Sequence, residues 1–248
     1  MKVDINCDLG EGSTASDCIA DAQLMPYISR CNIACGGHAG NLETMKASLE
    51  NAKKNHLQVG AHPGYPDPEN FGRNSMKISF NQLESSLIDQ ISQLEKIASK
   101  ISVSLSHIKC HGALYNDAES SPELANRLVK SFNTHFPGLS IIGLANGEME
   151  KAAQHLDCEF LREGFMDRAY LDSGYLVSRK APNSVYHSLE LIVKQALQLA
   201  QNQPLQTYQN NSLRIPVDTI CLHGDTPNAK TVAKQVFESL TAQGIDVA

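Results

Sequence analysis

The sequence predicts an α/β protein: a single domain, residues 1–248, built as a seven-stranded parallel (β/α) barrel of TIM-like architecture. Seven short apolar runs alternate with longer segments whose apolar residues recur with a 3.6-residue period. Strands that alternate with helices pair in parallel through right-handed crossovers. A length of 248 residues is ordinary for one barrel domain. About seven strands without the glycine pattern of a dinucleotide-binding fold favour a closed barrel, and an open doubly wound sheet is the alternative.

The short apolar runs have the length of buried strands, and each is too short for a core helix. They cover residues 3–7, 31–35, 57–61, 106–110, 139–144, 159–161 and 219–222. We expect each of them to be one strand of the barrel.

The amphipathic segments between these runs predict the outer helices. They cover residues 43–56, 80–101, 122–136, 147–156, 184–203 and 228–243. Proline at or just before a segment marks a helix start, and glycine just beyond a segment marks its end. The residues that give these signals are Pro122, Pro227, Gly138 and Gly244.

The composition excludes several classes of protein. The formal net charge of −6 argues against a nucleic-acid partner, because such proteins need clustered Lys and Arg to displace counterions. The N-terminus has no sustained apolar stretch, so we expect no signal peptide, no membrane span and a cytoplasmic location. The seven cysteines form no CxxC pair and are expected to be reduced. We expect those in apolar runs to be core residues rather than catalytic thiols.

Polar, ionisable side chains follow most of the predicted strands. Because the carboxyl ends of all strands of a parallel barrel meet at one face, these side chains are expected to share a pocket. A single histidine at a strand end is more often a hydrogen-bonded core residue than a catalyst, but here the pattern repeats with glycine nearby. The strand-end residues are Asp8, Glu11, His38, His62, Lys109, His111, Tyr115, His223 and Asp225. The histidines at 56, 107, 135, 155 and 187 are expected to have surface or packing roles.

Two-residue spacing places Asn6 and Asp8 on one side of their strand, and Lys109 and His111 on one side of another. Asp8 is suited to bind a metal, to orient a histidine or to act as a general base. Lys109 is suited to bind a carboxylate or to stabilise developing negative charge.

Two long loops, 64–79 and 164–182, are expected to be functional, because loops of this length are uncommon inside a compact domain. The second follows Glu163 and contains Asp167, Arg168 and Arg179 among aromatic residues. We interpret it as a lid whose arginines hold a substrate carboxylate or phosphate, with a solvated charge run as the alternative.

Several common motifs are missing from the sequence. It contains no GxxxxGK[ST] phosphate loop, no GxGxxG after the first strand, no GxSxG turn and no HExxH helix. If the reaction consumes ATP, we therefore expect that the chain does not bind it through a standard motif.

Five segments together resemble the motif set of the LamB/YcsF family: 4–11, 32–40, 60–67, 109–116 and 221–225. The resemblance covers essentially the whole chain and implies the barrel of the glycoside hydrolase/deacetylase superfamily. It also implies the activity of that family, which forms the A subunit of ATP-dependent 5-oxoprolinase. This activity cleaves 5-oxoproline to L-glutamate, coupled to hydrolysis of ATP to ADP and phosphate. Two further subunits, B and C, are implied as partners, with ATP bound mainly by them.

The sequence departs from the usual family residues at 37, 41, 110, 166 and 178. Only the departure at Asn41, where the family often has Asp, replaces an ionisable side chain by a neutral one. That departure puts in doubt a charged role for this loop.

The strand-end pattern and the resemblance together give a hypothesis for the site. The expected catalytic residues are Asp8, His38, His62, Lys109, His111, His223 and Asp225. The expected substrate-binding residues are Asn6, Glu11, Tyr115, Glu163, Asp167, Arg168 and Arg179.

Two alternatives remain at this point. One is a metal-dependent amide hydrolase or deacetylase acting alone, with a divalent ion on Asp8, His38 and His62. The other is a non-catalytic scaffold for partner proteins.

Overall fold

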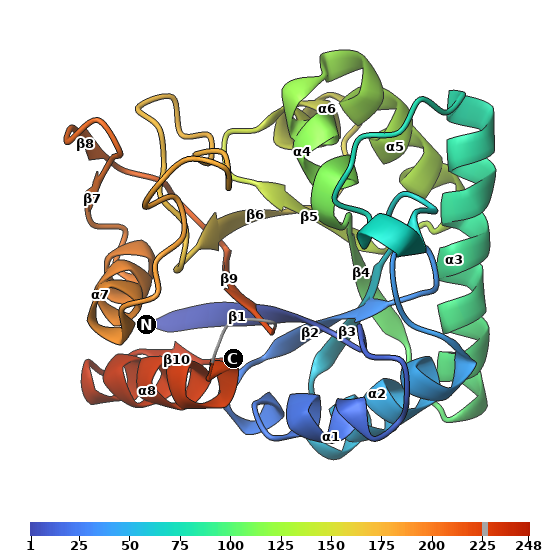
Figure 1. Ribbon diagram of the computed structural model, residues 1–248, viewed down its shortest axis with the longest axis horizontal. Coiled ribbons are helices and arrows are strands. Elements are labelled where there is room, and N and C mark those ends of the chain that lie inside the picture. Colours follow the sequence, from blue (N-terminus) through green and yellow to red (C-terminus); the bar gives the residue numbers. More distant parts are fainter. Residues whose placement is uncertain (225–227) are drawn as a thin grey trace.

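Seven parallel strands close into a barrel, as the sequence predicted. The computed structural model describes residues 1–224 and 228–248. The strands are β1 (Lys2–Leu9), β2 (Arg30–Ala34), β3 (Gln58–His62), β4 (Leu105–Lys109), β5 (Ser140–Leu144), β6 (Phe160–Phe165) and β9 (Thr219–His223). They pair in this order, and β9 pairs with β1 to complete the ring (Figure 1). The closure excludes the open doubly wound sheet.

Helices surround the barrel (Figure 1). They are α1 (Asp17–Ala22), α2 (Leu42–Lys54), α3 (Phe80–Lys100), α4 (Gly112–Ser120), α5 (Pro122–His135), α6 (Glu148–His155), α7 (Leu189–Ala200) and α8 (Ala229–Ala242). Six of them match the expected segments, but α7 begins at Leu189 rather than at residue 184. Helices α1 and α4 were not expected from the sequence. Helix α4 is short, directly follows a strand-end histidine and has a weak apolar periodicity, so the pattern of residues does not predict it.

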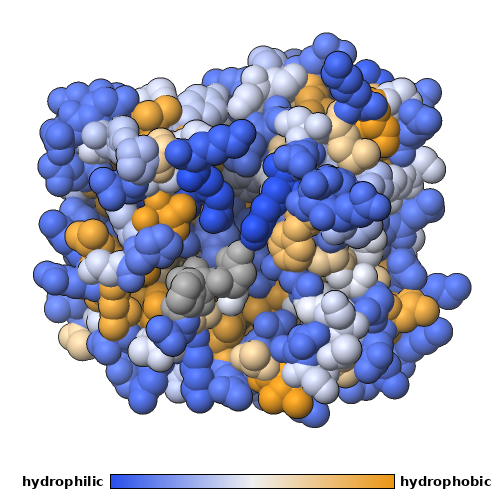
Figure 2. Space-filling view, in the orientation of Figure 1, coloured by the Kyte–Doolittle hydropathy of each residue, from blue (hydrophilic) through white to orange (hydrophobic). Residues whose placement is uncertain are grey.

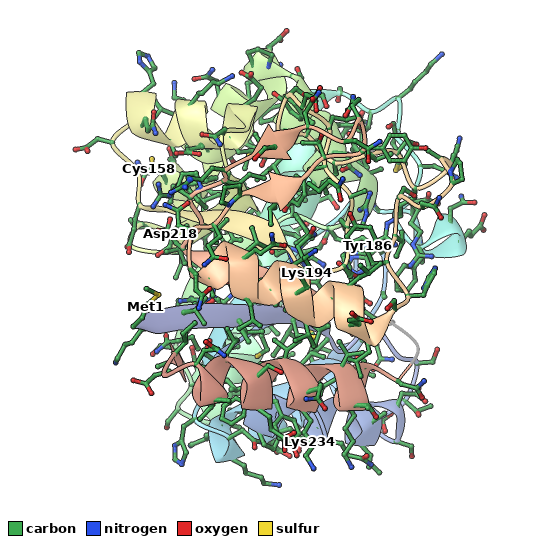
Figure 3. The ribbon with its side chains drawn as sticks, turned by 90° about the vertical axis from the view of Figure 1, so that its left-hand side faces the viewer. Met1, Cys158, Tyr186, Lys194, Asp218 and Lys234 are labelled. Carbon is green, nitrogen blue, oxygen red and sulfur yellow. The ribbon has the colours of Figure 1, made fainter. Side chains whose placement is uncertain are left out.

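Smaller elements complete the fold. Two 3₁₀ turns, η1 (Met25–Tyr27) and η2 (Pro68–Asn70), lie in the loops after β1 and β3. A two-stranded antiparallel pair, β7 (Leu205–Gln206) and β8 (Ser212–Leu213), lies between α7 and β9. The last strand, β10 (Asp246–Val247), pairs with the start of β1. Figure 3 shows α7 and α8 side by side, with Met1 and Cys158 toward one end of the barrel and Tyr186 toward the other.

The loop after β2 ends in a strong helix start. The side chain of Asn41 accepts hydrogen bonds from the backbone N–H groups of Glu43 and Thr44, and the Thr44 hydroxyl accepts from the backbone N–H of Asn41. Asparagine and aspartate cap helices about equally well. Asn41 therefore has a structural role that does not require a charge.

The barrel interior is unusually polar. The side chains of Asn6, Asn32, His107 and Glu163 are fully buried there, although barrels of this type are usually filled by branched apolar residues. Asn32 Nδ2 donates to Asn6 Oδ1 at 2.8 Å, and Asn6 Nδ2 donates to Glu163 Oε1 at 2.9 Å. Buried polar groups are costly unless they are hydrogen-bonded, so this network fixes the positions of its members.

The cysteines fill the core rather than form disulfides. All seven are free thiols, and only Cys158 is not buried. Burial raises the pKa of Cys31 and of Cys35 to about 12, so both remain protonated. In the described part of the chain, no helix is both long and apolar enough to cross a membrane.

Candidate active site

A cavity of about 690 Å³ opens at the carboxyl ends of the strands. In Figure 2 the centre of this face is hollowed and bordered by strongly hydrophilic side chains. Segments from several strand ends and from the 164–182 loop line it. The ionisable residues in the lining are Asp8, Glu11, Arg73, His111, Tyr115, Glu119, Arg168, Tyr175, Arg179, Lys180 and His223.

Lys109 lies between two carboxylates at the base of this cavity. Its Nζ is 3.0 Å from Asp8 Oδ1 and 2.8 Å from Glu163 Oε1, and it also donates to Asn6 Oδ1 at 3.1 Å. Burial disfavours the ammonium, but the charge of Asp8, together with that of Glu163, raises the pKa of Lys109 well above its ordinary value. Lys109 therefore stays charged and is already paired within the protein.

Asp8 is held as a carboxylate that faces the cavity. Asn32 Nδ2 and Lys109 Nζ both donate to its Oδ1, at 2.7 and 3.0 Å. Burial disfavours this charge, yet the fields of His62 and Lys109 outweigh it and hold the pKa of Asp8 well below its usual range. A carboxylate with so low a pKa is a weak general base. Asp8 is better suited to orient its neighbours and to stabilise positive charge.

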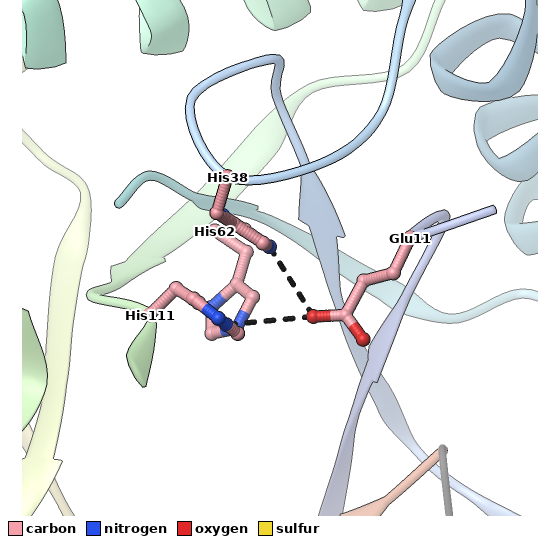
Figure 4. Close-up of side chains that lie close together, drawn as sticks. All are labelled: Glu11, His38, His62 and His111. Atoms are coloured by element: carbon pink, nitrogen blue, oxygen red, sulfur yellow. Dashed lines mark hydrogen bonds and ion pairs between the residues drawn. The ribbon is translucent and has the colours of Figure 1, made fainter. Parts of the chain in front are cut away.

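Three histidines and a glutamate form a compact cluster (Figure 4). Asp8 is next to it, with its Oδ2 3.5 Å from His62 Nε2. Glu11 Oε1 lies 3.2 Å from His38 Nε2 and 3.4 Å from His111 Nδ1, and His62 Nε2 lies 3.0 Å from His111 Nδ1. Burial lowers the pKa of His38 and of His111 to about 4, and lowers that of His62 well below its ordinary value. All three imidazoles are neutral near pH 7, which is the form that binds metals.

On the other side of the cavity, His223 forms a dyad with a buried carboxylate. His223 Nδ1 is 2.7 Å from Asp167 Oδ2, and Arg179 Nη2 is 3.0 Å from His223 Nε2. Burial disfavours the imidazolium, but the charge and hydrogen bond of Asp167 outweigh it and raise the pKa of His223. An imidazole held in this way by a carboxylate is a suitable proton carrier.

The two arginines of the 164–182 loop have different environments. Arg168 is buried, and its guanidinium donates to the carbonyl oxygens of Ser184 and Val177, at 3.3 and 2.6 Å. Burial and the neighbouring Arg179 lower the pKa of Arg168 to about 10. Arg179 is exposed at the cavity. Arg168 thus holds the loop in place, while Arg179 is positioned to meet a ligand.

With this geometry established, similarity to known proteins identifies the family. The family profile described as LamB/YcsF matches residues 3–248. The chain belongs to the LamB/YcsF family.

Full-length relatives agree with this membership. A protein of Erwinia tasmaniensis, named as the A subunit of 5-oxoprolinase, is 38% identical over 247 residues, covering 100% of this chain and 99% of the relative. A protein of Staphylococcus saprophyticus with the same name is 37% identical, covering 100% of this chain and 98% of the relative. A third protein with this name, from Bacillus cereus, is 34% identical, covering 99% of this chain and 97% of the relative.

Solved structures show the same fold. The lactam utilization protein of Thermus thermophilus superposes with a TM-score of 0.93 at 33% identity, covering 100% of this chain and 99% of that one. The family 4 carbohydrate esterase of Streptomyces lividans superposes with a TM-score of 0.50 at 13% identity, covering 100% of this chain and 91% of that one. The second similarity concerns the fold alone, and it agrees with the barrel expected from the sequence.

In this LamB/YcsF chain, the candidate residues separate into three neighbouring groups. The histidine cluster contains Glu11, His38, His62 and His111; the ion cluster contains Asn6, Asp8, Lys109 and Glu163; the dyad contains Asp167 and His223 with Arg179. Arg168 lies behind the dyad as a support for the loop. Asp225, also expected to be catalytic, lies outside the described residues.

Tyr115 lines the cavity near Glu163 of the ion cluster. It is buried, and burial together with the nearby charge of Glu163 raises the pKa of its hydroxyl well above the ordinary value. The hydroxyl is therefore a hydrogen-bond donor and not a base near neutral pH.

Sequence reasoning missed three residues of this site. Asn32 orients Asp8, and His107, expected only to pack, donates from Nε2 to Asn32 Oδ1 at 2.7 Å. Glu119 lines the cavity and accepts from the backbone N–H groups of Leu144 and Met149, and burial raises its pKa to about 8. The alternation of residues along the 31–35 run could have revealed Asn32, since it places this side chain inside the barrel beside Asn6 and Asp8.

Proposed function

We propose that the chain acts as the A subunit of an ATP-dependent 5-oxoprolinase, which cleaves the lactam of 5-oxo-L-proline to give L-glutamate with hydrolysis of ATP to ADP and phosphate. The observation that carries this proposal is the full-length similarity, at 34–38% identity, to proteins named as the A subunit of 5-oxoprolinase. The cavity at the barrel mouth supports it, because it combines a proton carrier, an ionised carboxylate and an exposed arginine.

The chemistry explains why ATP is needed. Hydrolysis adds water to the lactam carbonyl, breaks the ring C–N bond and delivers a proton to the ring nitrogen. An unstrained five-membered lactam is a poor electrophile with a poor leaving group. Transfer of the γ-phosphoryl group from ATP to the amide oxygen leaves ADP and activates the carbonyl carbon for attack by water. Breaking the ring C–N bond then gives an acyl phosphate, and a second water releases phosphate and leaves the side-chain carboxylate of glutamate.

The side chains in the cavity fit the ring-opening step. His223, with Asp167 on its Nδ1, takes a proton from the attacking water and returns one to the ring nitrogen. Arg179 binds the carboxylate of 5-oxoproline, for which a guanidinium gives two parallel hydrogen bonds. Asp8 and Lys109 hold the polar floor of the cavity in a fixed arrangement.

The remaining steps are assigned to partners. The sequence has no standard phosphate-binding motif, so ATP binds mainly to two further subunits, B and C, which perform the phosphorylation. The complex is expected in the cytoplasm, where ATP is supplied.

The test is glutamate release from 5-oxoproline by the purified chain, assayed with and without ATP and with and without the two partner subunits. Release only in the complete ATP-containing mixture supports the proposal. Release by the chain alone without ATP contradicts it.

One observation favours a second candidate, a metal-dependent amide hydrolase that acts alone. The cluster of Glu11, His38, His62 and His111 offers neutral imidazoles and a carboxylate in one place. If the chain alone hydrolyses an amide, and a chelator abolishes the activity until zinc or manganese is returned, this second function replaces the first.

A further inference from the structure

The proton positions on two histidines of the cluster follow from their outer hydrogen bonds. His62 Nδ1 lies 2.9 Å from the carbonyl oxygen of Lys109, and His111 Nε2 lies 2.9 Å from the carbonyl oxygen of Phe71. A carbonyl oxygen can only accept, so each of these ring nitrogens carries the proton and donates it. A neutral imidazole has a single N–H. His62 Nε2 and His111 Nδ1 therefore carry lone pairs.

These two lone pairs face each other across 3.0 Å. Negative charge flanks them on both sides: Asp8 Oδ2 is 3.5 Å from His62 Nε2, and Glu11 Oε1 is 3.4 Å from His111 Nδ1. Two facing lone pairs repel each other, and a cation bound by both of them removes this repulsion.

We propose that His62 Nε2, His111 Nδ1 and Glu11 Oε1 bind a divalent transition-metal ion, with zinc as the best match. Zinc favours neutral imidazole and carboxylate ligands in tetrahedral geometry, and Zn–N bonds of about 2.0–2.1 Å put neighbouring ligand atoms about 3.3 Å apart. The separations found here from His111 Nδ1 are 3.0 Å to His62 and 3.4 Å to Glu11. Three protein ligands leave a fourth position for another ligand, as in catalytic zinc sites.

His38 acts as a positioning residue for this site. Its ring is stacked on that of His111 at 3.5 Å, with only 5° between the ring planes, so both rings cannot point their lone pairs at one ion from these positions. Its Nε2 instead lies 3.2 Å from Glu11 Oε1 and fixes the carboxylate.

The 64–79 loop holds the histidines of the site in position. Phe71 supplies the carbonyl that orients His111, and its ring packs edge-on against His38 and His111. The next residue, Gly72, has φ +60, and a β-carbon there would lie 2.7 Å from His38 Cβ. Only glycine allows this close approach in that conformation. Carbonyls that accept from the outer nitrogen of a metal-binding histidine are a regular feature of metal sites.

The neighbouring group of Asp8, Cys221 and His223 is not a second metal site. Lys109 Nζ lies 3.0 Å from Asp8 Oδ1 and 3.2 Å from Cys221 Sγ, so an ammonium already occupies that position. Burial also raises the pKa of Cys221 well above its ordinary value, which keeps the thiol protonated. The same contacts direct Asp8 toward Lys109, so the structure favours Glu11 over Asp8, which was the carboxylate ligand in the metal-dependent alternative.

The metal site does not depend on the proposed reaction, and its test measures binding alone. The full chain is treated with a chelator, dialysed and titrated with Zn²⁺ by calorimetry, and with Co²⁺ by visible absorption, which reports the coordination geometry. We expect one ion per chain and the absorption of a low-coordinate Co²⁺ site. Uptake well below one ion per chain, or only weak binding without such absorption, overturns the proposal.

Variants locate the ion. Loss of a residue that only supports a metal ligand weakens metal binding roughly 10–100-fold. His38→Gln should fall within this range. His62→Gln and His111→Gln, which remove ligands, should weaken Zn²⁺ binding by more. His155→Gln, at an exposed position on α6, should bind as the wild type does. Circular dichroism checks each fold, and if a histidine variant does not fold, Glu11→Gln replaces it. Unchanged binding in folded His62→Gln, His111→Gln or Glu11→Gln would place the ion elsewhere and overturn the assignment.

Discussion

Lys109 Nζ and Glu163 Oε1 lie 2.8 Å apart in the centre of the barrel, and both side chains are buried. With Asp8, 3.0 Å away on the other side, they form a buried cluster of one cation and two anions. Asn6 and Asn32 complete its hydrogen bonds. The cluster connects the stability of the barrel to the geometry of the cavity floor, because Asp8 belongs to both.

Replacing Lys109 by Met should destabilise the protein by about 3–5 kcal/mol, since it leaves two buried carboxylates without their cation. Denaturant unfolding at pH 7 measures the change. Adding Glu163→Gln to the variant should recover part of the loss, because it removes one of the two unpaired charges. Lys151→Met, at an exposed pair with Glu148, is the matched control and should have little effect. If Lys109→Met unfolds with the same midpoint as the control, the cluster does not have this role.

Asp167→Asn should lower the pKa of His223, because the carboxylate is what raises it. The imidazole must be neutral to take a proton from water, so wild-type activity should fall as the pH drops through the raised pKa. In the variant this acidic limb should move to lower pH, and kcat should decrease by about 10²–10⁴-fold because the imidazole loses its orienting partner. NMR titration of His223 and the pH dependence of kcat/KM measure both effects. An unchanged titration of His223 would contradict the dyad.

Arg179→Gln should raise the KM for 5-oxoproline about 10–100-fold, which corresponds to the loss of a charged hydrogen bond worth about 1.5–3 kcal/mol. The stability should not change, because Arg179 is exposed. Arg179→Lys should recover only part of the affinity, since an ammonium lacks the planar pair of donors. Arg127→Gln on the outer face of α5 serves as the control. Wild-type KM in Arg179→Gln would exclude this residue from substrate binding.

Arg168→Gln should loosen the 164–182 loop instead. Its guanidinium holds the carbonyls of Ser184 and Val177, which glutamine is too short to reach together. Hydrogen exchange followed by mass spectrometry should show faster exchange in this loop, with the rest of the barrel unchanged. Exchange as slow as in the wild type would mean that Arg168 does not fasten the loop.

The sequence was a good guide to the barrel and to the location of the site for a physical reason. Strand and helix periods differ, so the βα alternation can be read directly, and a parallel barrel brings every strand end to one face. His62, His111 and His223 could therefore be placed at one face of the barrel although they are far apart in the chain. The short helix α4 was not predicted, because tertiary contacts, and not a clear amphipathic pattern, stabilise it.

What the sequence could not provide is the direction of each side chain at the barrel mouth. Lys109 was expected to meet a ligand, but Asp8 and Glu163 on two other strands already pair with it. Phe71 orients His111 through its backbone carbonyl, which any residue type would supply. Such long-range pairings depend on the register between strands, and a single sequence does not show it.

The most direct test of the proposed function compares the wild-type chain with Asp8→Asn in the complete mixture of three subunits, ATP and 5-oxoproline, with glutamate as the measured product. Asparagine keeps the shape of the side chain but removes its charge, and circular dichroism confirms that the variant is folded. We expect ATP-dependent glutamate release by the wild type and a loss of at least about 100-fold in the variant. Near wild-type release by Asp8→Asn, or no release by the wild type, would contradict the proposed active site.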